Sequence, residues 1–415
     1  MCDVGSFVVG GERTMTHESL KQSMNKNNGI LRMVPDFIPR DSWMPGRRLR
    51  LHPDDYAYYG NELGMIEERW FCATAPVEHG VKNAPENLGM QYVDCDGERI
   101  FFKDAVEELK DELIGTELWN RYGRWPMFSK FYDFATTSFF HVHPTEASAC
   151  CKPGAVMKPE AYYYPPQMNM AAANENVITY LGIDPSVTKE EVLERLKKFD
   201  TEENRIVELS RAYRLELGTG WYTPAGVLHG CGAWCTYEPQ WMSESYAVFE
   251  NYPDNHYPAF SHEEMSNLVP DDADDEYEYT MSLIDWDINT DPYYRKKYFR
   301  RPIIETETEA YVSKWITYGN PYFGAKELTI KPGKSALIKD KSAYGCILLT
   351  GHGMFGELDC EAPNVIRINQ MTKDEFFVSH KRANEGVLIT NNSCEDMVML
   401  KHFCNNCGMP DAPEV

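Results

Sequence analysis

The stretch SFFHVHP, residues 138–144, decides the fold. Its aromatic and β-branched residues are typical of a β-strand, on which alternate side chains face the same side. His141 and His143 therefore project together, while Val142 points to the opposite face. Because neutral imidazole binds most divalent first-row metals well, this pair predicts half of a metal site. A pair of polar residues at the mouth of a barrel is the alternative interpretation.

A second stretch, GTGWYTPAGVLH at residues 218–229, supplies a third imidazole. Pro224 and Gly226 predict a tight turn between two strands, and His229 follows on the strand that leaves the turn. The HxH pair followed by G-x5-P-x-G-x2-H matches the two cupin motifs in their order, so the chain resembles the cupin superfamily. This resemblance implies double-sheet β-barrels that hold a metal inside the barrel.

Short β segments extend on both sides of these motifs. Residues 127–164 contain aromatic-rich runs separated by Pro and Gly, and the same pattern resumes after Gly218. Beyond residue 300, runs such as KELTIKPGKSALI and YGCILLTGHGMFGEL predict a second block of short strands. We therefore predict a mainly β protein with two cupin barrels of the double-stranded β-helix, or jelly-roll, type.

Helical patterns interrupt the first β block. Residues 104–118, DAVEELKDELIGTEL, place apolar residues at helical spacing and begin with an acidic residue suited to capping. Residues 187–200, VTKEEVLERLKKFD, predict another helix that Ser186 or Thr188 would cap. The helical pattern continues through EENRIVELSRAYRL at residues 202–215.

Three parts of the chain follow from these patterns. Residues 1–100 would form an N-terminal arm and first strands that join the metal-bearing barrel. Residues 101–300 would form that barrel, with a helical insert at about 168–214. Residues 301–415 would form a second, metal-free barrel and a C-terminal tail, because this part lacks a second HxH pair and a second PxGxxH.

Composition excludes several classes of protein. The net charge of −23 over 415 residues argues against binding nucleic acid. No run of about 18 apolar residues is present, which argues against a membrane span, and the N-terminus does not resemble a secretory signal. The 12 cysteines lack a disulfide pattern and indicate reduced thiols in a cytoplasmic protein. Cys404 and Cys407 have zinc-knuckle spacing without a second pair.

A third motif narrows the resemblance to one family. NRYGRWPMFSKFYD at residues 120–133 leads into the HxH stretch, and Lys158-Pro159-Glu160 follows it. This order resembles the type I mannose-6-phosphate isomerases, in which R-F-P-x-x-x-K-x-L-D-A precedes Q-x-H-P and a K-P-E glutamate binds zinc. The resemblance covers residues 100–250 by motif and the remainder by architecture. It implies an aldose–ketose isomerase that acts on a hexose or hexose phosphate through a cis-enediol.

The resemblance assigns the metal ligands residue by residue. His143, Glu160 and His229 match the family's ligands, and His141 stands where the family usually has glutamine. The implied cofactor is one divalent metal, with zinc preferred. Manganese, iron and nickel are alternatives, because three histidines and one glutamate fit them as well. Glu146 is the rival carboxylate, since it lies closer to the HxH pair.

Glu238 and Lys158 are the predicted catalytic residues. Glu238 lies nine residues after His229, where the family keeps an acidic active-site residue, and it would transfer the proton. Its alternative role is to orient a histidine ligand. Lys158 would hold a substrate oxygen or neutralise Glu160.

One departure from the family bears on the substrate. The family has an arginine ten residues after its active-site acid, and this chain has Val248 at that position. Recognition of a phosphate group is therefore in question, and Arg121, Arg124 and Lys130 are the candidates to replace the arginine. The predicted ligand is a small sugar or a sugar phosphate, and a homodimer is compatible with the sequence.

Two other functions fit the same residues. Three histidines and one glutamate also suit an iron- or manganese-dependent cupin oxygenase or decarboxylase. A non-catalytic sugar-binding cupin would explain the missing arginine. Consumption of oxygen with bound iron would favour the first alternative, and sugar binding without turnover at full metal occupancy would favour the second.

Overall fold

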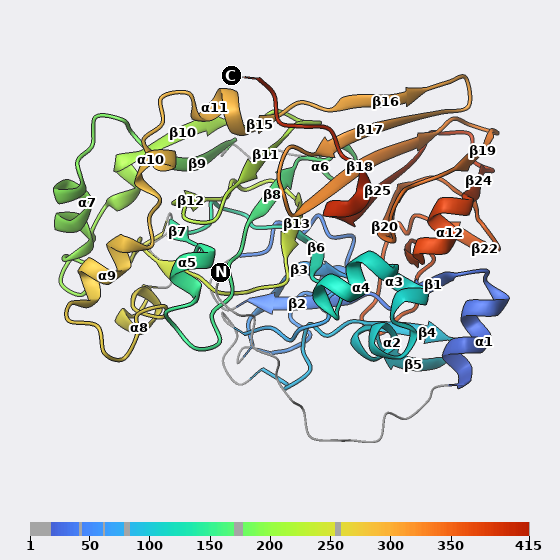
Figure 1. The fold of residues 1–415 in the computed structure, drawn as a ribbon, viewed down its shortest axis with the longest axis horizontal. Helices are drawn as coiled ribbons and strands as arrows, with labels where there is room; N and C mark the ends of the chain where they lie inside the picture. The colour runs from blue at the N-terminus through green and yellow to red at the C-terminus, as the bar shows by residue number, and fades with distance from the viewer. Residues whose placement is uncertain are drawn as a thin grey trace.

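The computed structural model describes residues 18–40, 44–60, 63–78, 84–169, 177–253 and 259–414. The strands of these residues form antiparallel sheets of nine, seven, five and four strands. The chain is thus mainly β, as its aromatic and β-branched runs predicted (Figure 1). Within the described residues, no helix combines the length and apolar character that crossing a membrane requires.

The five-stranded and seven-stranded sheets contain the sequence motifs. In spatial order, the five-stranded sheet contains β10 (Ser210–Arg214), β9 (Ile178–Ile183), β12 (His229–Gly230), β7 (His141–Val142) and β14 (Ala247–Val248). The seven-stranded sheet contains β15 (Phe299–Arg300), β11 (Gly220–Thr223), β8 (Glu160–Tyr163), β13 (Thr236–Trp241), β6 (Met127–Tyr132), β3 (Met65–Phe71) and β2 (Asp36–Arg40). The turn at Pro224 and Gly226 therefore joins a strand of one sheet to a strand of the other.

The other two sheets contain most strands beyond residue 300. The nine-stranded sheet contains β16 (Ile303–Glu307), β17 (Tyr311–Thr317), β18 (Phe323–Ile330), β25 (Met397–Cys404), β20 (Tyr344–Thr350), β23 (Glu375–Val378), β1 (Ile30–Met33), β4 (Tyr92–Cys95) and β5 (Glu98–Phe101). The four-stranded sheet contains β19 (Ser335–Ile338), β24 (Val387–Asn391), β21 (His352–Phe355) and β22 (Leu358–Glu361). The first hundred residues are thus divided, because β1, β4 and β5 join the nine-stranded sheet while β2 and β3 join the seven-stranded one.

Strand alternation separates the site from the core behind it. On β6 and β13, Phe131 and Tyr237 pack with Ile347 and other apolar residues of the nine-stranded sheet. Their chain neighbours Lys130 and Glu238 project to the opposite face, since successive side chains of a strand alternate. Each fully buried large apolar side chain contributes about 1.5–3 kcal/mol relative to exposure. This packing holds the seven-stranded sheet in place from behind.

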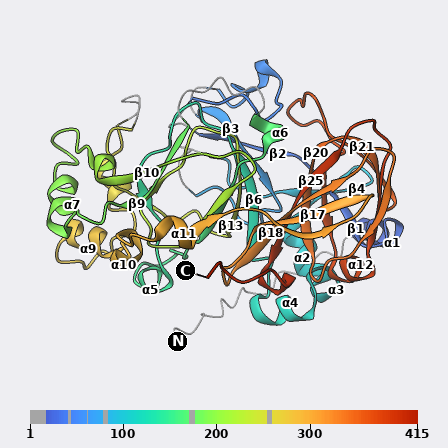
Figure 2. The same cartoon turned by 90° about the horizontal axis from the view of Figure 1, so that it is seen from above.

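The helices lie around the sheets. They are α1 (Glu18–Lys26), α2 (Phe102–Leu109), α3 (Asp111–Ile114), α4 (Thr116–Tyr122), α5 (Glu146–Ala149), α6 (Pro166–Asn169), α7 (Lys189–Leu196), α8 (His262–Met265), α9 (Glu276–Ser282), α10 (Trp286–Asn289), α11 (Tyr294–Tyr298) and α12 (His380–Glu385). Figure 2 shows α7, α9 and α10 at one end of the molecule, beyond β9 and β10, with β18, β20 and β25 toward the other.

Two helical predictions need correction. The single helix predicted at 104–118 is three short helices, because Lys110 and Gly115 have φ angles of +49° and +88° that end α2 and α3. The continuation predicted at 202–215 is wrong: a 3-10 turn at Ile206–Leu209 leads into β10, which pairs with β9. Here sheet pairing overrides a local helical pattern.

The helix predicted after residue 186 is confirmed as α7. Thr188 is its cap, because the Thr188 hydroxyl accepts from the Glu191 amide at 3.2 Å while the Glu191 carboxylate accepts from the Thr188 amide at 2.7 Å. This reciprocal pair satisfies two amide groups that the first turn leaves without helical partners.

Candidate metal centre

Three imidazoles gather between the five-stranded and seven-stranded sheets. His141 on β7 and His229 on β12 are directly opposite each other on neighbouring strands. Their ring centroids are 4.1 Å apart, and that of His143 lies 5.0 Å from His141 and 5.1 Å from His229. Tertiary pairing therefore adds the histidine of the second motif to the pair of the first.

Backbone carbonyls determine which nitrogen of each ring carries the proton. The Nδ1 atoms of His141, His143 and His229 lie 2.9, 2.8 and 2.8 Å from the carbonyl oxygens of Phe139, Ser245 and Val227. A carbonyl only accepts, so each Nδ1 carries the proton and donates it. In a neutral imidazole the Nε2 atom then holds a lone pair, which is the form that binds a metal.

Glu160, the first residue of β8, completes the cluster from the seven-stranded sheet. Its Oε1 lies 3.0 Å from Nε2 of His229, and its Oε2 lies 3.1 Å from Nε2 of His143. Nε2 of His229 is buried without a hydrogen-bond partner. With the proton on Nδ1, this lone pair faces a carboxylate oxygen, an arrangement that a cation between them would stabilise. The residues present therefore fit a metal ion.

Outer contacts hold Glu160 in place. Tyr162, two residues further along β8, donates its phenolic proton to Oε1 of Glu160. The thiol of Cys231 in turn donates to the Tyr162 oxygen at 3.1 Å. Such partners of a ligand orient it and adjust its donor strength. Two groups of atoms within 4.8 Å of one another could hold a metal: the three histidines, and Glu160 with His229 and Cys231.

A chain of alternating charges leads away from Glu160. Lys158 lies 3.0 Å from Glu160 and 3.8 Å from Glu238. Lys130 lies 3.5 Å from Glu238 and 3.5 Å from Glu68. The chain ends at Arg40, which contacts both Glu68 and Glu244 at 2.9 Å. All seven side chains are buried, so these ion pairs are screened little by solvent.

These surroundings shift the pKa values of the carboxyl groups in opposite directions. Burial and the neighbouring Glu160 raise the pKa of Glu238 well above its usual range, although Lys130 and Lys158 oppose this. Burial also opposes ionisation of Glu160, but Lys158 and the imidazoles hold the pKa of Glu160 well below its usual range. The charged form of Glu160 is thus favoured, whereas that of Glu238 is disfavoured.

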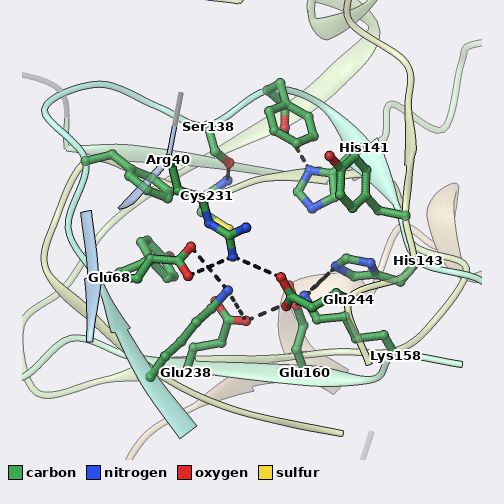
Figure 3. Close-up of a pocket in the computed structure, with 15 residues that line it drawn as sticks. Arg40, Glu68, Ser138, His141, His143, Lys158, Glu160, Cys231, Glu238 and Glu244 are labelled. Atoms are coloured by element: carbon green, nitrogen blue, oxygen red, sulfur yellow. Dashed lines mark hydrogen bonds and ion pairs between the residues drawn. The ribbon is translucent and has the colours of Figure 1, made fainter. Parts of the chain in front are cut away.

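A cavity of about 70 Å³ connects these groups. His141, His143, Glu160, Lys158 and Glu238 all line it, and Figure 3 shows them together with Arg40, Glu68 and Glu244. The apolar part of the lining comes from Tyr132, Phe134, Phe139 and Tyr246. His229 belongs to the same cluster through its contact with Glu160.

Several sequence candidates lie elsewhere. Glu146, the rival carboxylate, is exposed at the start of α5. Arg121 and Arg124 are exposed and do not line the cavity, whereas Lys130 does. Val248 is buried in an apolar cluster with Val142 and other residues. The family's arginine position is therefore occupied by a core side chain here.

Four residues of the site were not identified from the sequence: Arg40, Glu68, Cys231 and Glu244. Cys231 had a usable signal, because it follows His229 by two residues and such spacing on a strand shares a face. Arg40 and Glu68 come from β2 and β3, which carry no recognisable motif. Their place in the cavity depends on the pairing of β3 with β6.

Fold and cluster together describe a mainly β protein with a metal-capable site. A scan of protein-family models finds none that matches this chain, and a search of curated proteins finds no match. Solved structures do resemble it. The mannose 6-phosphate isomerase from Bacillus subtilis matches with a TM-score of 0.58 at 17% identity, over 90% of this chain and 99% of that one.

Two further solved structures show the same likeness. A variant of phosphomannose isomerase from Salmonella typhimurium gives a TM-score of 0.60 at 10% identity, over 91% of this chain and 100% of that one. A mannose 6-phosphate isomerase bound with zinc and yttrium gives 0.56 at 10% identity, over 90% and 99%. This chain therefore has the fold of the mannose-6-phosphate isomerases, as its motifs predicted. Identities this low establish the fold alone, so function must be argued from the site.

We expect His141 and His143 to reduce the stability of the metal-free protein as the pH falls from about 6.5 to about 4. Burial, followed by the charge of Lys158, lowers the pKa of His143 to about 4, and burial lowers the pKa of His141 well below 6.5. Unfolded histidines, with pKa values near 6.5, bind more protons in this window, so the contribution of these two residues to stability falls with pH. For His143 alone the loss is about 3 kcal/mol.

Denaturant unfolding of the metal-free protein across that pH range measures the loss. The matched variant is His141→Gln, which removes one buried imidazole with a lowered pKa, so its stability relative to the unmodified protein should improve as the pH falls. A stability difference between the two proteins that does not change between about pH 6.5 and about pH 4.5 would contradict the prediction.

Proposed function

We propose that this protein is a metal-dependent aldose–ketose isomerase that acts on a small sugar through a cis-enediol. One observation carries the proposal: the metal-capable histidine and glutamate cluster borders the same cavity as Glu238, a buried carboxyl group between two lysines. The mannose-6-phosphate isomerase fold supports it by analogy.

His141, His143, Glu160 and His229 would hold one divalent metal. Zinc is our preferred ion, because a similar solved structure is described as zinc-bound, and manganese, iron and nickel also accept this donor set. When bound, the ion supplies Lewis-acid stabilisation of negative charge on oxygen, a contribution often worth several kcal/mol. Cys231 would remain a supporting residue through Tyr162.

Glu238 is the proposed proton carrier. In the ionised state its carboxylate takes the proton from the carbon beside the carbonyl and returns it to the former carbonyl carbon, while the hydroxyl proton of the first carbon passes to the former carbonyl oxygen. A raised pKa suits this work, because a general base is most effective when its pKa lies near the working pH. Lys158, 3.8 Å from Glu238, would donate a hydrogen bond to a substrate oxygen.

The sheets support a two-barrel arrangement. We propose that the five-stranded and seven-stranded sheets form a metal-bearing cupin barrel, mainly within residues 101–300. The nine-stranded and four-stranded sheets, mostly within 301–415, would form the second barrel. In the described part of the chain, His352, Glu375 and His380 belong to neither metal-capable cluster.

Metal removal tests the proposed function. Protein stripped with a chelator should lose aldose–ketose isomerisation, and one equivalent of zinc or manganese should restore it, because the cluster has one set of ligands. The assay follows ketose formation from a panel of free and phosphorylated aldoses. Sugar binding without turnover at full metal occupancy would contradict the proposal and indicate a non-catalytic cupin.

A cupin oxygenase or decarboxylase is the second candidate function. His141 stands where the family usually has glutamine, and three histidines with one glutamate also suit iron in a cupin oxygenase or decarboxylase. An oxygen electrode distinguishes the two functions. Substrate-dependent oxygen consumption by the iron-loaded protein, without isomerisation, would support this candidate.

A further inference from the structure

We propose that the cavity selects an uncharged polyhydroxy substrate and rejects its phosphate ester. The inference rests on the proposed function for its chemistry, but it concerns binding and can be tested without turnover. It starts from the charge chain Glu244, Arg40, Glu68, Lys130, Glu238, Lys158 and Glu160, which is shown in part in Figure 3.

Every lysine and arginine among the described residues of the cavity lining lies beside two carboxyl groups. Arg40 contacts Glu68 and Glu244, and both distances are 2.9 Å. Lys130 lies 3.5 Å from Glu68 and 3.5 Å from Glu238. Lys158 repeats the pattern between Glu160 and Glu238. A phosphate would have to compete with buried carboxylates for each of these cations, and separating a buried ion pair costs several kcal/mol.

The basic side chains away from the imidazoles are balanced by carboxylates. Figure 3 shows Glu68 across the cavity from His141 and His143. Arg40 contacts both Glu68 and Glu244, and Lys130 also lies 3.5 Å from Glu68. A sugar whose reacting end lies at the metal ligands would place its phosphate away from them. A phosphate dianion there would have to displace a buried carboxylate from Arg40 or Lys130, in a place that solvent screens little.

An uncharged sugar can hydrogen-bond to the alternating carboxyl groups and basic side chains of the cavity. Carboxylates only accept hydrogen bonds, and lysine and arginine only donate them, whereas each sugar hydroxyl does both. A row of hydroxyl groups can therefore bridge alternating acceptors and donors, while a phosphate oxygen can satisfy only the donors. The replacement of the family's arginine by the buried Val248 agrees with this assignment.

Paired ligands test the proposal on the metal-loaded protein. Isothermal titration calorimetry would compare mannose with mannose 6-phosphate and ribose with ribose 5-phosphate, with inorganic phosphate as a further probe. We expect the free sugar of each pair to bind at least about tenfold more tightly, a difference of about 1.4 kcal/mol, and inorganic phosphate not to compete. Equal affinity, tighter binding of the phosphate esters, or binding of neither member overturns the proposal.

An isomerase assay on the same ligands distinguishes a failure of this proposal from a failure of the isomerase function. If free sugars bind preferentially and none is isomerised, selection of neutral ligands stands and the isomerase function fails. If phosphate esters are isomerised preferentially, the isomerase function stands and selection of neutral ligands fails.

A charge variant locates the origin of the selectivity. Glu244→Gln removes one of the two partners of Arg40, so the phosphate ester should gain affinity and the preference for the free sugar should shrink about tenfold. Glu263→Gln, at an exposed position of α8, makes the same change in net charge away from the cavity and should leave the preference unchanged. An equal effect of both variants, or none from Glu244→Gln in a folded protein, overturns the assignment to Arg40 and its carboxylates.

Discussion

Replacing His229 with alanine should remove the bound metal and reduce isomerase turnover by roughly 10²–10⁴-fold. The ring is 1% exposed, lies 4.1 Å from that of His141, and directs its free nitrogen at Glu160. Loss of one ligand from this set should weaken metal affinity by more than the ~10–100-fold that loss of an outer partner costs. The expected fall in turnover corresponds to several kcal/mol of lost Lewis-acid stabilisation.

Elemental analysis of the purified variant, followed by the isomerase assay, measures both effects. His352→Ala is the matched control, because His352 is exposed on β21 in the four-stranded sheet. That variant should keep the metal content and the turnover of the unmodified protein. A full equivalent of tightly bound metal in His229→Ala would show that the cluster is not the metal site.

Replacing Glu238 with glutamine should leave the metal bound and lower turnover by roughly 10²–10⁴-fold, the usual contribution of a positioned general acid–base group. Glutamine has nearly the same shape as glutamate but cannot carry the proton. Glu238 contacts Lys130 and Lys158 rather than a histidine ligand, so the metal cluster should persist. Reduced turnover with unchanged metal content would indicate that Glu238 transfers the proton. A residue that only orients a metal ligand would lower the metal affinity as well.

Metal content and single-turnover rates are the measurements for Glu238→Gln. Glu146→Gln offers the comparison, since Glu146 is an exposed carboxylate of α5 near the HxH stretch in sequence. It should change neither quantity. Full turnover in Glu238→Gln would rule out Glu238 as the base and return the role to another cavity residue.

Local rules made part of the site predictable. Alternation along a strand placed His141 and His143 on one face, and the turn chemistry of Pro224 and Gly226 placed His229 at the start of a strand. These are short-range consequences of backbone geometry, so they survive any arrangement of the remaining chain. The same kind of rule failed at residues 202–215, where the helical spacing was outweighed by the pairing of β10 with β9.

Short-range rules predict a mainly β chain and the placement of the three histidines, because strand alternation and turns act between close neighbours, whereas Glu160 is assigned through a family resemblance. Only the tertiary fold brings Arg40, Glu68 and Glu244 into the same cavity and buries Val248 in an apolar cluster. Those positions follow from the pairing of β2 with β3 and of β3 with β6, contacts between segments far apart in the chain. No local pattern encodes such pairing, because it is set by which faces bury apolar surface together.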